Sequence, residues 1–165
     1  MAINPNTAFS AGNIFTADQA NRFPRGVIVY KQETANYTLT TSAAQSAATN
    51  NFALTFTSTG NRFYRISYYE PAAETSTAST SYTSLYIYSG ASLGALTLQN
   101  QRTYLYTPGT QKVQAGMLAQ YVTAPAAGTI YVTAAASTTN TTGAPVLGRN
   151  VFQPAQFIVE DLGPF

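Results

Sequence analysis

Apolar and polar residues alternate along most of this chain, which is the pattern of strands with one buried face. In residues 51–58, NFALTFTS, the side chains of Phe52, Leu54 and Phe56 fall on one face. In residues 62–69, RFYRISYY, one side carries Tyr64, Ile66 and Tyr68, and the other carries Phe63, Arg65, Ser67 and Tyr69. With the turn at 59–61 between them, the two segments predict a hairpin with aromatic cross-strand pairs.

The same pattern predicts a series of short strands separated by turn signals. They are expected at 27–30, 36–41, 51–58, 62–69, 82–90, 111–123, 129–136 and 155–161, with two short strands around Asn100 within 95–109. Residues 70–81 and 137–145 are rich in Ser, Thr and Ala without an apolar period, and we expect loops there. We therefore predict an all-β fold, a single β-sandwich or jelly-roll domain.

One segment, residues 111–123, fits two patterns. Val113, Met117 and Leu118 fall on a helical stripe, but the apolar residues at every second position from Val113 to Tyr121 also fit the alternation of a strand. Gly116 and the β-branched residues near its end weaken a helix, so we favour a strand.

The front of the chain differs from the rest. Residues 1–15 have no period and are interpreted as an extended arm. Thr16 and Gln19 match a capping box, Asp18 lies in the first turn, and Pro24 ends the segment, which predicts a helix of about two turns. Such a helix is too short to be stable alone, since isolated helices need about 12–15 residues. We therefore divide the chain into an attachment segment, 1–26, and a sandwich domain, 27–165.

Composition points to a protein that works within an assembly. The chain has 165 residues, of which 45% are hydrophobic and 8% are charged, whereas about 25% are charged in a typical domain. A surface with so few charges is poorly protected against association. The net charge is +2 and the basic residues are scattered, which argues against nucleic-acid binding. No apolar span is long enough for a membrane helix, and the N-terminus lacks the pattern of a conventional secretory signal.

The inventory of reactive side chains is small. The absence of His and Cys excludes Ser-His-Asp and Cys-His catalysis and the usual zinc and copper ligand sets. Glu70 and Glu74 lie on either side of a proline in the loop expected at 70–81, and they make a weak candidate for a paired-carboxylate hydrolase. Glu160 and Asp161 could ligate calcium, but such an adjacent pair is more typical of a solvated strand end. We expect no enzyme, no catalytic residue, no cofactor and no metal.

Twelve Tyr and no Trp leave two interpretations of the aromatic residues. They form an exposed stacking surface for sugar rings or another subunit, or they simply line the faces of strands. The candidates for the first are Tyr64, Tyr68, Tyr82, Tyr86 and Tyr88. Arg62 and Arg65 lie among aromatic residues, and we expect them to cover rings and to pair with carboxylates.

Three stretches resemble a family of small structural proteins of tailed bacteriophages. Residues 14–30, IFTADQANRFPRGVIVY, are similar to the family's front, and residues 123–136, TAPAAGTIYVTAAA, to its penultimate hairpin. Residues 153–164, QPAQFIVEDLGP, are similar to its C-terminal strand. The residues that match are Thr16, Asp18, Asn21, Arg22, Pro24, Arg25, Gly26, Glu160, Asp161, Gly163 and Pro164. Phe23 departs from the pattern, because a smaller aliphatic residue is usual there.

The resemblance implies a virion component with a β-sandwich body. It points to a capsid decoration or cement protein on the head surface, a homotrimer that contacts the major capsid protein, and not to a membrane or nucleic-acid partner. The alternative is a tail or fibre component that binds a host glycan. In either case we expect the arm to attach the domain, through Phe15, Thr16, Asp18, Arg22, Phe23 and Arg25.

Overall fold

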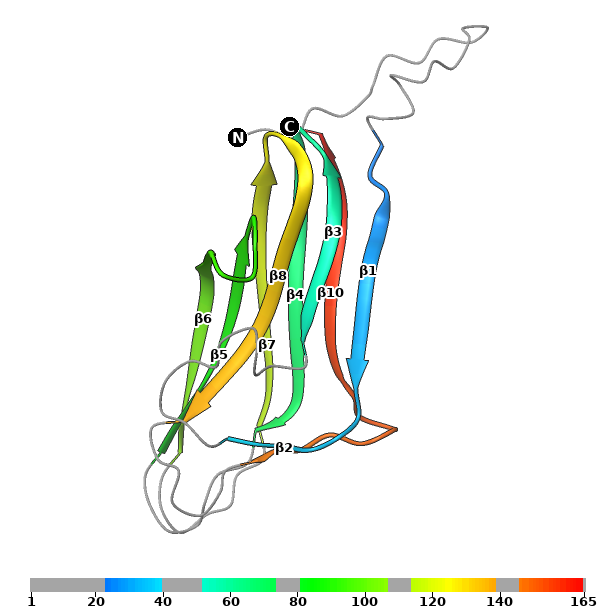
Figure 1. Ribbon diagram of the computed structural model, residues 1–165. Coiled ribbons are helices and arrows are strands. Elements are labelled where there is room, and N and C mark those ends of the chain that lie inside the picture. The colour runs from blue at the N-terminus through cyan, green and yellow to red at the C-terminus, as the bar shows by residue number, and fades with distance from the viewer. Residues whose placement is uncertain (1–22, 40–51, 74–80, 107–113, 139–145, 165) are drawn as a thin grey trace, which may run out of the picture.

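A computed structural model describes residues 23–39, 52–73, 81–106, 114–138 and 146–164 (Figure 1). These residues form strands and contain no helix. The strands are β1 (Gly26–Glu33), β2 (Tyr37–Thr38), β3 (Ala53–Thr59), β4 (Arg62–Ala73), β5 (Ser81–Gly90), β6 (Leu96–Tyr106), β7 (Gln114–Ala124), β8 (Ala127–Thr138), β9 (Val146–Leu147) and β10 (Ala155–Pro164). The all-β fold class is therefore confirmed, whereas the helix expected before Pro24 lies outside the described residues.

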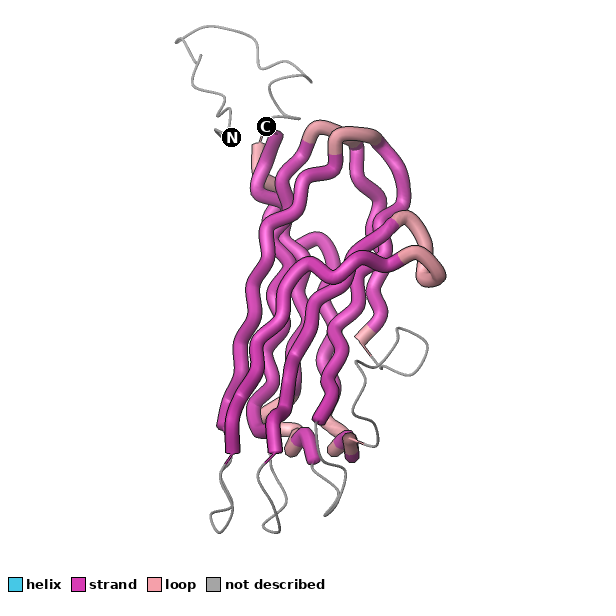
Figure 2. The backbone as a smooth tube through the Cα atoms, turned by 90° about the vertical axis from the view of Figure 1, so that its left-hand side faces the viewer, coloured by secondary structure: helices cyan, strands magenta, loops and turns pink. Residues whose placement is uncertain are grey.

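The long strands form two antiparallel sheets. In the first sheet β1 pairs with β10, β10 with β4, and β4 with β7. In the second sheet the order is β3-β8-β5-β6. The short strands β2 and β9 pair with each other, and β9 extends the first sheet at the end of β4. Figure 2 shows the two layers of the resulting sandwich.

The pairing is nested along the chain, which identifies the sandwich as a jelly roll. The first long strand pairs with the last, β3 with β8, β4 with β7, and β5 with β6. One long hairpin wound around the core produces this arrangement, in which two Greek keys close over each other. Because every partner is distant in sequence except at the β5–β6 turn, the fold depends on long-range contacts.

The core lies between the sheets and is largely aromatic. Tyr64, Ile66 and Tyr68 of β4 face inward and are at most 1% exposed. Phe56 of β3 packs against Tyr64 with ring centroids 4.7 Å apart, and Phe52 lies 5.6 Å from Tyr68. These contacts join one sheet to the other, so the alternating pattern of both segments correctly identified their buried faces.

The predicted pairing of those two segments is wrong. β3 and β4 are consecutive but belong to different sheets, and β3 pairs with β8 over Ala53–Thr59. The turn at 59–61 therefore crosses between layers, where Gly60 has a φ of 84° and Asn61 donates its N–H to the carbonyl of Pro125 at 3.3 Å. Alternation shows which face is buried, but it does not show which strand is the neighbour.

The structure also corrects the expected limits of two strands and settles the ambiguous segment. β6 is one strand rather than two, with a bulge opposite Ile87 and Tyr88 near Asn100. β4 continues to Ala73, so residues 70–73 are strand and not loop. The ambiguous segment is a strand, β7, as favoured, because it completes the first sheet against β4.

Candidate functional site

The two ends of the described chain meet at the upper end of Figure 1, where the arm joins the sandwich. In the register of β1 and β10, Gly26 lies opposite Asp161 and Val27 opposite Glu160. The front and C-terminal stretches that carry the phage-protein resemblance are thus neighbours in space. We call the group formed by Phe23, Arg25, Arg62, Asp161 and Gly163 the arm junction.

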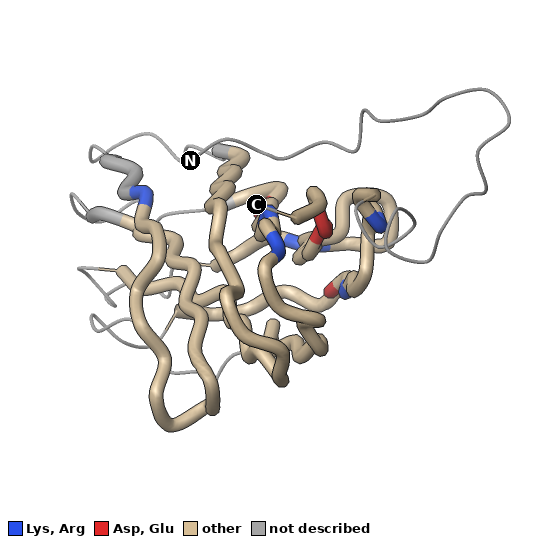
Figure 3. Tube along the Cα trace, turned by 90° about the horizontal axis from the view of Figure 1, so that it is seen from above, with Lys and Arg blue, Asp and Glu red and all other residues tan. Residues whose placement is uncertain are grey.

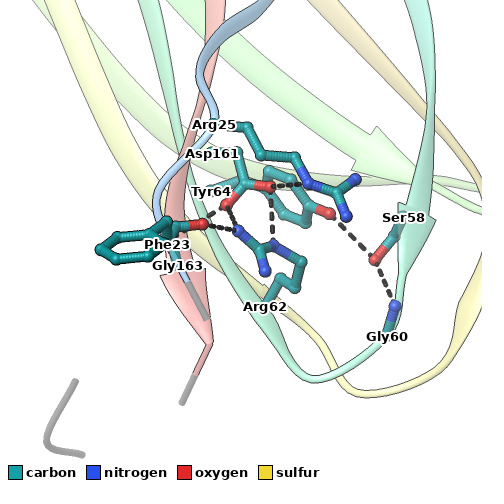
Figure 4. A network of polar contacts seen from close by, with 8 residues as sticks. All are labelled: Phe23, Arg25, Ser58, Gly60, Arg62, Tyr64, Asp161 and Gly163. Atoms are coloured by element: carbon teal, nitrogen blue, oxygen red, sulfur yellow. Dashed lines mark hydrogen bonds and ion pairs between the residues drawn. The ribbon is translucent and has the colours of Figure 1, made fainter. Parts of the chain in front are cut away.

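A buried ion pair stands at the centre of the arm junction (Figure 4). The Nε atom of Arg62 lies 2.6 Å from Oδ2 of Asp161, and its Nη2 atom lies 2.6 Å from Oδ1. The two side chains are 3% and 1% exposed. This two-point geometry fixes the orientation of both groups, and each satisfies the charge that burial would otherwise leave unpaired.

The same guanidinium group holds the end of the arm. Nη2 of Arg62 also donates to the backbone carbonyl of Phe23 at 2.7 Å, so Arg62 connects β10 to the residue at which the described chain begins. Arg25 approaches the other side, with Nε 4.0 Å from Oδ2 of Asp161 and 43% of its side chain exposed. Phe23 itself is 41% exposed. The arm junction is therefore buried at its centre and open to solvent at Phe23 and Arg25.

Two glycines let the backbone reach this geometry. Gly26 has a φ of 70°, a conformation that costs other residues about 1 kcal/mol or more, and it turns the chain from the arm into β1. Gly163 has a φ of 109° at a bulge of β10 and donates its N–H to Oδ1 of Asp161 at 2.9 Å. The glycines of the two resemblance motifs are thus required by backbone conformation.

A short chain of hydroxyl contacts supports the site from the second sheet. The hydroxyl of Tyr64 donates to Oγ of Ser58 at 3.0 Å, and the N–H of Gly60 donates to the same oxygen at 3.0 Å. These contacts connect the turn between β3 and β4 to the inner face of β4, next to Arg62 (Figure 4). Chemically the site offers carboxylate, guanidinium and backbone groups that already satisfy one another, an arrangement suited to holding chain segments together.

A second buried ion pair lies at the opposite end of β4. Glu70, which is 0% exposed, accepts hydrogen bonds from Arg149 at 2.7–3.2 Å and from the hydroxyl of Tyr68 at 2.7 Å. Burial raises the pKa of Glu70, and the hydrogen bonds and charge of Arg149 offset only part of that effect. Burial, followed by the charge of Glu70, also raises the pKa of Tyr68. The expectation that Glu70 lies in a loop with Glu74 is wrong, and Glu74 lies outside the described residues.

Charged side chains are sparse around the fold, and most of them are paired. Figure 3 shows several of both signs gathered beside the C-terminal end. Arg65 forms an ion pair with Glu160 at 3.1 Å, and Arg62 pairs with Asp161, so the expected pairing of both arginines with carboxylates is confirmed. The interpretation of Glu160 and Asp161 as a solvated strand end is wrong for Asp161. In the part of the chain that the structure describes, no cluster of three potential metal ligands occurs.

The expected aromatic surface exists only in part. Tyr64 and Tyr68 are wrong candidates, because both are 1% exposed and belong to the core. The side chain of Tyr82 lies outside the described residues. Tyr86 and Tyr88 lie on the outer face of β5, partly exposed, and their rings stack at 6.0 Å with an angle of 29°. The hydroxyl of Tyr86 contacts Oγ of Ser137 at 3.0 Å, which fixes the orientation of this ring.

The structure describes only some of the residues that were expected to attach the arm. Phe15, Thr16, Asp18 and Arg22 lie outside it, whereas Phe23 and Arg25 lie in the arm junction. Sequence reasoning missed the pairing of Arg62 with Asp161 and the role of Arg149. A signal was present for Arg62, since it shares the parity of Tyr64 and Ile66 on β4, and this parity directs its side chain to the inner face.

Comparisons add no relatives to this description. Among the described residues no helix has the length and apolarity of a membrane span. No family model matches the chain, and the comparison with curated proteins gives no match either.

Proposed function

We propose that this chain is a non-enzymatic structural protein of a tailed bacteriophage virion. In this proposal it decorates or cements the capsid surface, assembles as a homotrimer that contacts the major capsid protein, and is attached through its N-terminal arm. The resemblance at both ends of the chain supplies the class of protein. The fold is compatible with this role, since jelly rolls occur in viral capsid proteins, but it does not by itself establish a function.

The observation that carries the proposal is the arm junction. Arg62 binds Asp161 and the carbonyl of Phe23 together, so a force on the arm is transmitted directly to the central strands β4 and β10. An attachment segment needs such an anchorage at the point where it leaves the folded body. The front and C-terminal stretches that resemble phage structural proteins meet at this anchorage.

A second candidate function is supported by the pair of Tyr86 and Tyr88. Stacked, partly exposed tyrosine rings on a sheet face form a surface on which the apolar face of a sugar can pack. This pair favours the alternative of a tail or fibre component that binds host glycan. The two candidates differ in location: a decoration protein lies over the head, and an adhesin lies at the tail.

Immunogold labelling of intact particles tests the proposal. With an antibody raised against this chain, a decoration protein gives gold spread over the head. Gold restricted to the tail would favour the glycan-binding candidate, and a Tyr86→Ala, Tyr88→Ala variant should then lose binding to host cells. Intact and disrupted particles that both lack the chain would contradict a role in the virion.

A further inference from the structure

The upper end of the sandwich contains a hollow of about 460 Å³ between β7, β8 and the turn after β5. It is lined by Ser89, Gly90, Ala91 and the residues from Val122 to Ile130, none of which is charged. Figures 1 and 2 show the cause: β5 and β6 end well below the upper ends of β7 and β8. At this level the second sheet therefore consists of β3 and β8 alone.

The strand edge beside the hollow has no partner among the described residues. β8 pairs with β3 from Ala127 onward, but its pairing with β5 begins only at Tyr131, opposite Gly90. The N–H of Ala134 points to β3, where it donates to the carbonyl of Phe52 at 3.0 Å. Because main-chain groups alternate in direction along a strand, those of Ala127 and Thr129 point the other way, into the space beside the hollow.

The facing edge of β7 is covered only in its lower part. The side chain of Asn100 on β6 donates to the carbonyl of Ala119 at 2.9 Å, and Arg102 donates to that of Met117 at 3.4 Å. These contacts end where the hollow begins, and Tyr121 and Thr123 continue upward as exposed residues. An exposed strand edge is a template for pairing with a further strand, and folded proteins usually cover or interrupt such an edge.

We propose that the hollow is a strand-acceptor site and that it binds the N-terminal arm, residues 1–22, of a second copy of this chain. The arm adds a strand beside residues 127–130 of β8, with main-chain hydrogen bonds along the edge and apolar side chains in the hollow. The inference rests on the proposed function, because it takes the arm to be an attachment segment. The strand exchange itself requires no phage particle, since the donor and the acceptor are both copies of this protein.

Three features of the chain match the arm to this site. It begins at the same end of the sandwich as the hollow, since Phe23 is bound by Arg62, and Arg62 lies opposite Ala124, which lines the hollow. Its 22 residues can extend to about 70 Å at about 3.3 Å each, enough to reach a neighbouring molecule. Residues 1–17 carry no charged side chain, so none loses its hydration on entering an uncharged hollow.

The positions of donor and acceptor favour exchange between copies. β1, which continues from the arm, is at one edge of the first sheet, and β7, beside the hollow, is at the other. Donation from the β1 side of one molecule to the β7 side of the next is a head-to-tail contact. Such contacts close into a ring when the rotation between neighbours allows it, and a ring of three is the trimer that we propose for the virion protein.

Disulfide trapping in the full-length chain tests the exchange, because the natural sequence contains no Cys. One chain carries Ser10→Cys and a differently tagged chain carries Thr129→Cys, and the two are co-expressed and oxidised. Parallel samples use Ala11→Cys or Asn13→Cys in the arm, so that both faces of an added strand are sampled. The matched control replaces Thr129→Cys by Thr57→Cys, an exposed threonine directly across the β3–β8 pair.

We expect a disulfide between differently tagged chains for at least one arm position with residue 129, and at least tenfold less with residue 57. If a chain that carries both substitutions forms only the bond within itself, the arm folds back and exchange is contradicted. If no arm position links to residue 129, or if it links equally to residue 57, the acceptor site is wrong. Incorporation of the unmodified chain into particles is scored separately, so failure of the virion role is distinguished from failure of exchange.

Discussion

The two ends of β4 carry the same kind of interaction and use it differently. The inner face of this strand reads Arg62, Tyr64, Ile66, Tyr68 and Glu70, with a buried ion pair at each end and aromatic core between them. At the lower end Glu70 binds Arg149, which also lies 4.9 Å from the ring centroid of Phe52. At the upper end Asp161 binds Arg62, but that arginine holds the arm as well.

The two buried ion pairs differ in their surroundings. The lower pair is enclosed, and it fixes a turn in which Asn150 accepts hydrogen bonds from the N–H groups of Phe152 and Gln153. The upper pair has an exposed side, where Phe23 and Arg25 are each about two-fifths exposed. We conclude that the lower pair stabilises the fold, whereas the upper pair joins the fold to an attachment segment.

The largest expected effect is at the enclosed pair. Arg149→Met leaves Glu70 buried without its cation, and we expect the free energy of unfolding to fall by about 3–5 kcal/mol. Urea denaturation measures this loss. A chain with both Arg149→Met and Glu70→Leu should recover much of it, because no charge then remains buried. A loss below about 1 kcal/mol in the single variant would contradict the enclosed character of this pair.

At the arm junction we expect a smaller loss of stability than at the pair of Glu70 and Arg149, together with a local increase in protease sensitivity. Asp161→Asn keeps the shape of the side chain but removes its charge, which should cost about 1–3 kcal/mol. Trypsin cleavage after Arg25 should accelerate, because Arg62 no longer holds Phe23 in a fixed position. Arg149→Met supplies the control: at a denaturant concentration where both variants remain folded, it should not accelerate that cleavage.

The pH dependence should separate the enclosed pair from the rest of the molecule. Because burial raises the pKa of Glu70 above its ordinary 4.5, the folded state binds a proton here more tightly than the unfolded state. The contribution of this group to stability is full below about pH 4.5 and is lost as the pH rises through the raised pKa. Urea midpoints measured from pH 4 to 7 should show this decline, and the Arg149→Met, Glu70→Leu chain should lack it.

The smallest effect is expected at the exposed side of the junction. Arg25 lies 4.0 Å from Asp161 and is 43% exposed, so Arg25→Gln should change the free energy of unfolding by less than about 0.5 kcal/mol. A loss as large as that of Asp161→Asn would show that the arginine is enclosed like Arg62. Thermal and urea unfolding, measured side by side with the natural chain, decide between the two.

The sequence predicted the fold class and the buried faces of residues 52–56 and 62–69, because both depend on local alternation. In β7 the alternation pointed to the wrong face, since Met117 and Tyr121 are exposed. Tyr64 and Tyr68 share the inner parity with Ile66, and the same alternation should have removed them from the exposed aromatic candidates. Strand order was not accessible in this way, since β3 meets β8 about seventy residues later and the turn at 59–61 gives no sign that it crosses between sheets. The jelly-roll order is a property of long-range pairing.

The sequence pointed to residues of the arm junction in two separate stretches, but not to their contact. Arg25 and Asp161 were each singled out within separate stretches, but their meeting depends on the β1–β10 pairing, which joins the ends of the chain. Arg149 was missed because nothing in residues 148–150 indicates that its side chain lies inside the sandwich. Its partner Glu70 was assigned to a loop because residues 70–81 are rich in Ser, Thr and Ala and lack an apolar period, although β4 continues to Ala73.

The central claim is that the arm attaches a folded domain, and removal of residues 1–22 tests it most directly. The shortened chain keeps Phe23 and Arg25, and hence the arm junction. Its occupancy on purified particles is measured beside the full-length chain, with circular dichroism to verify the β-fold. We predict a folded domain whose occupancy falls at least tenfold. A folded, shortened chain that joins particles as well as the full-length protein would contradict the account.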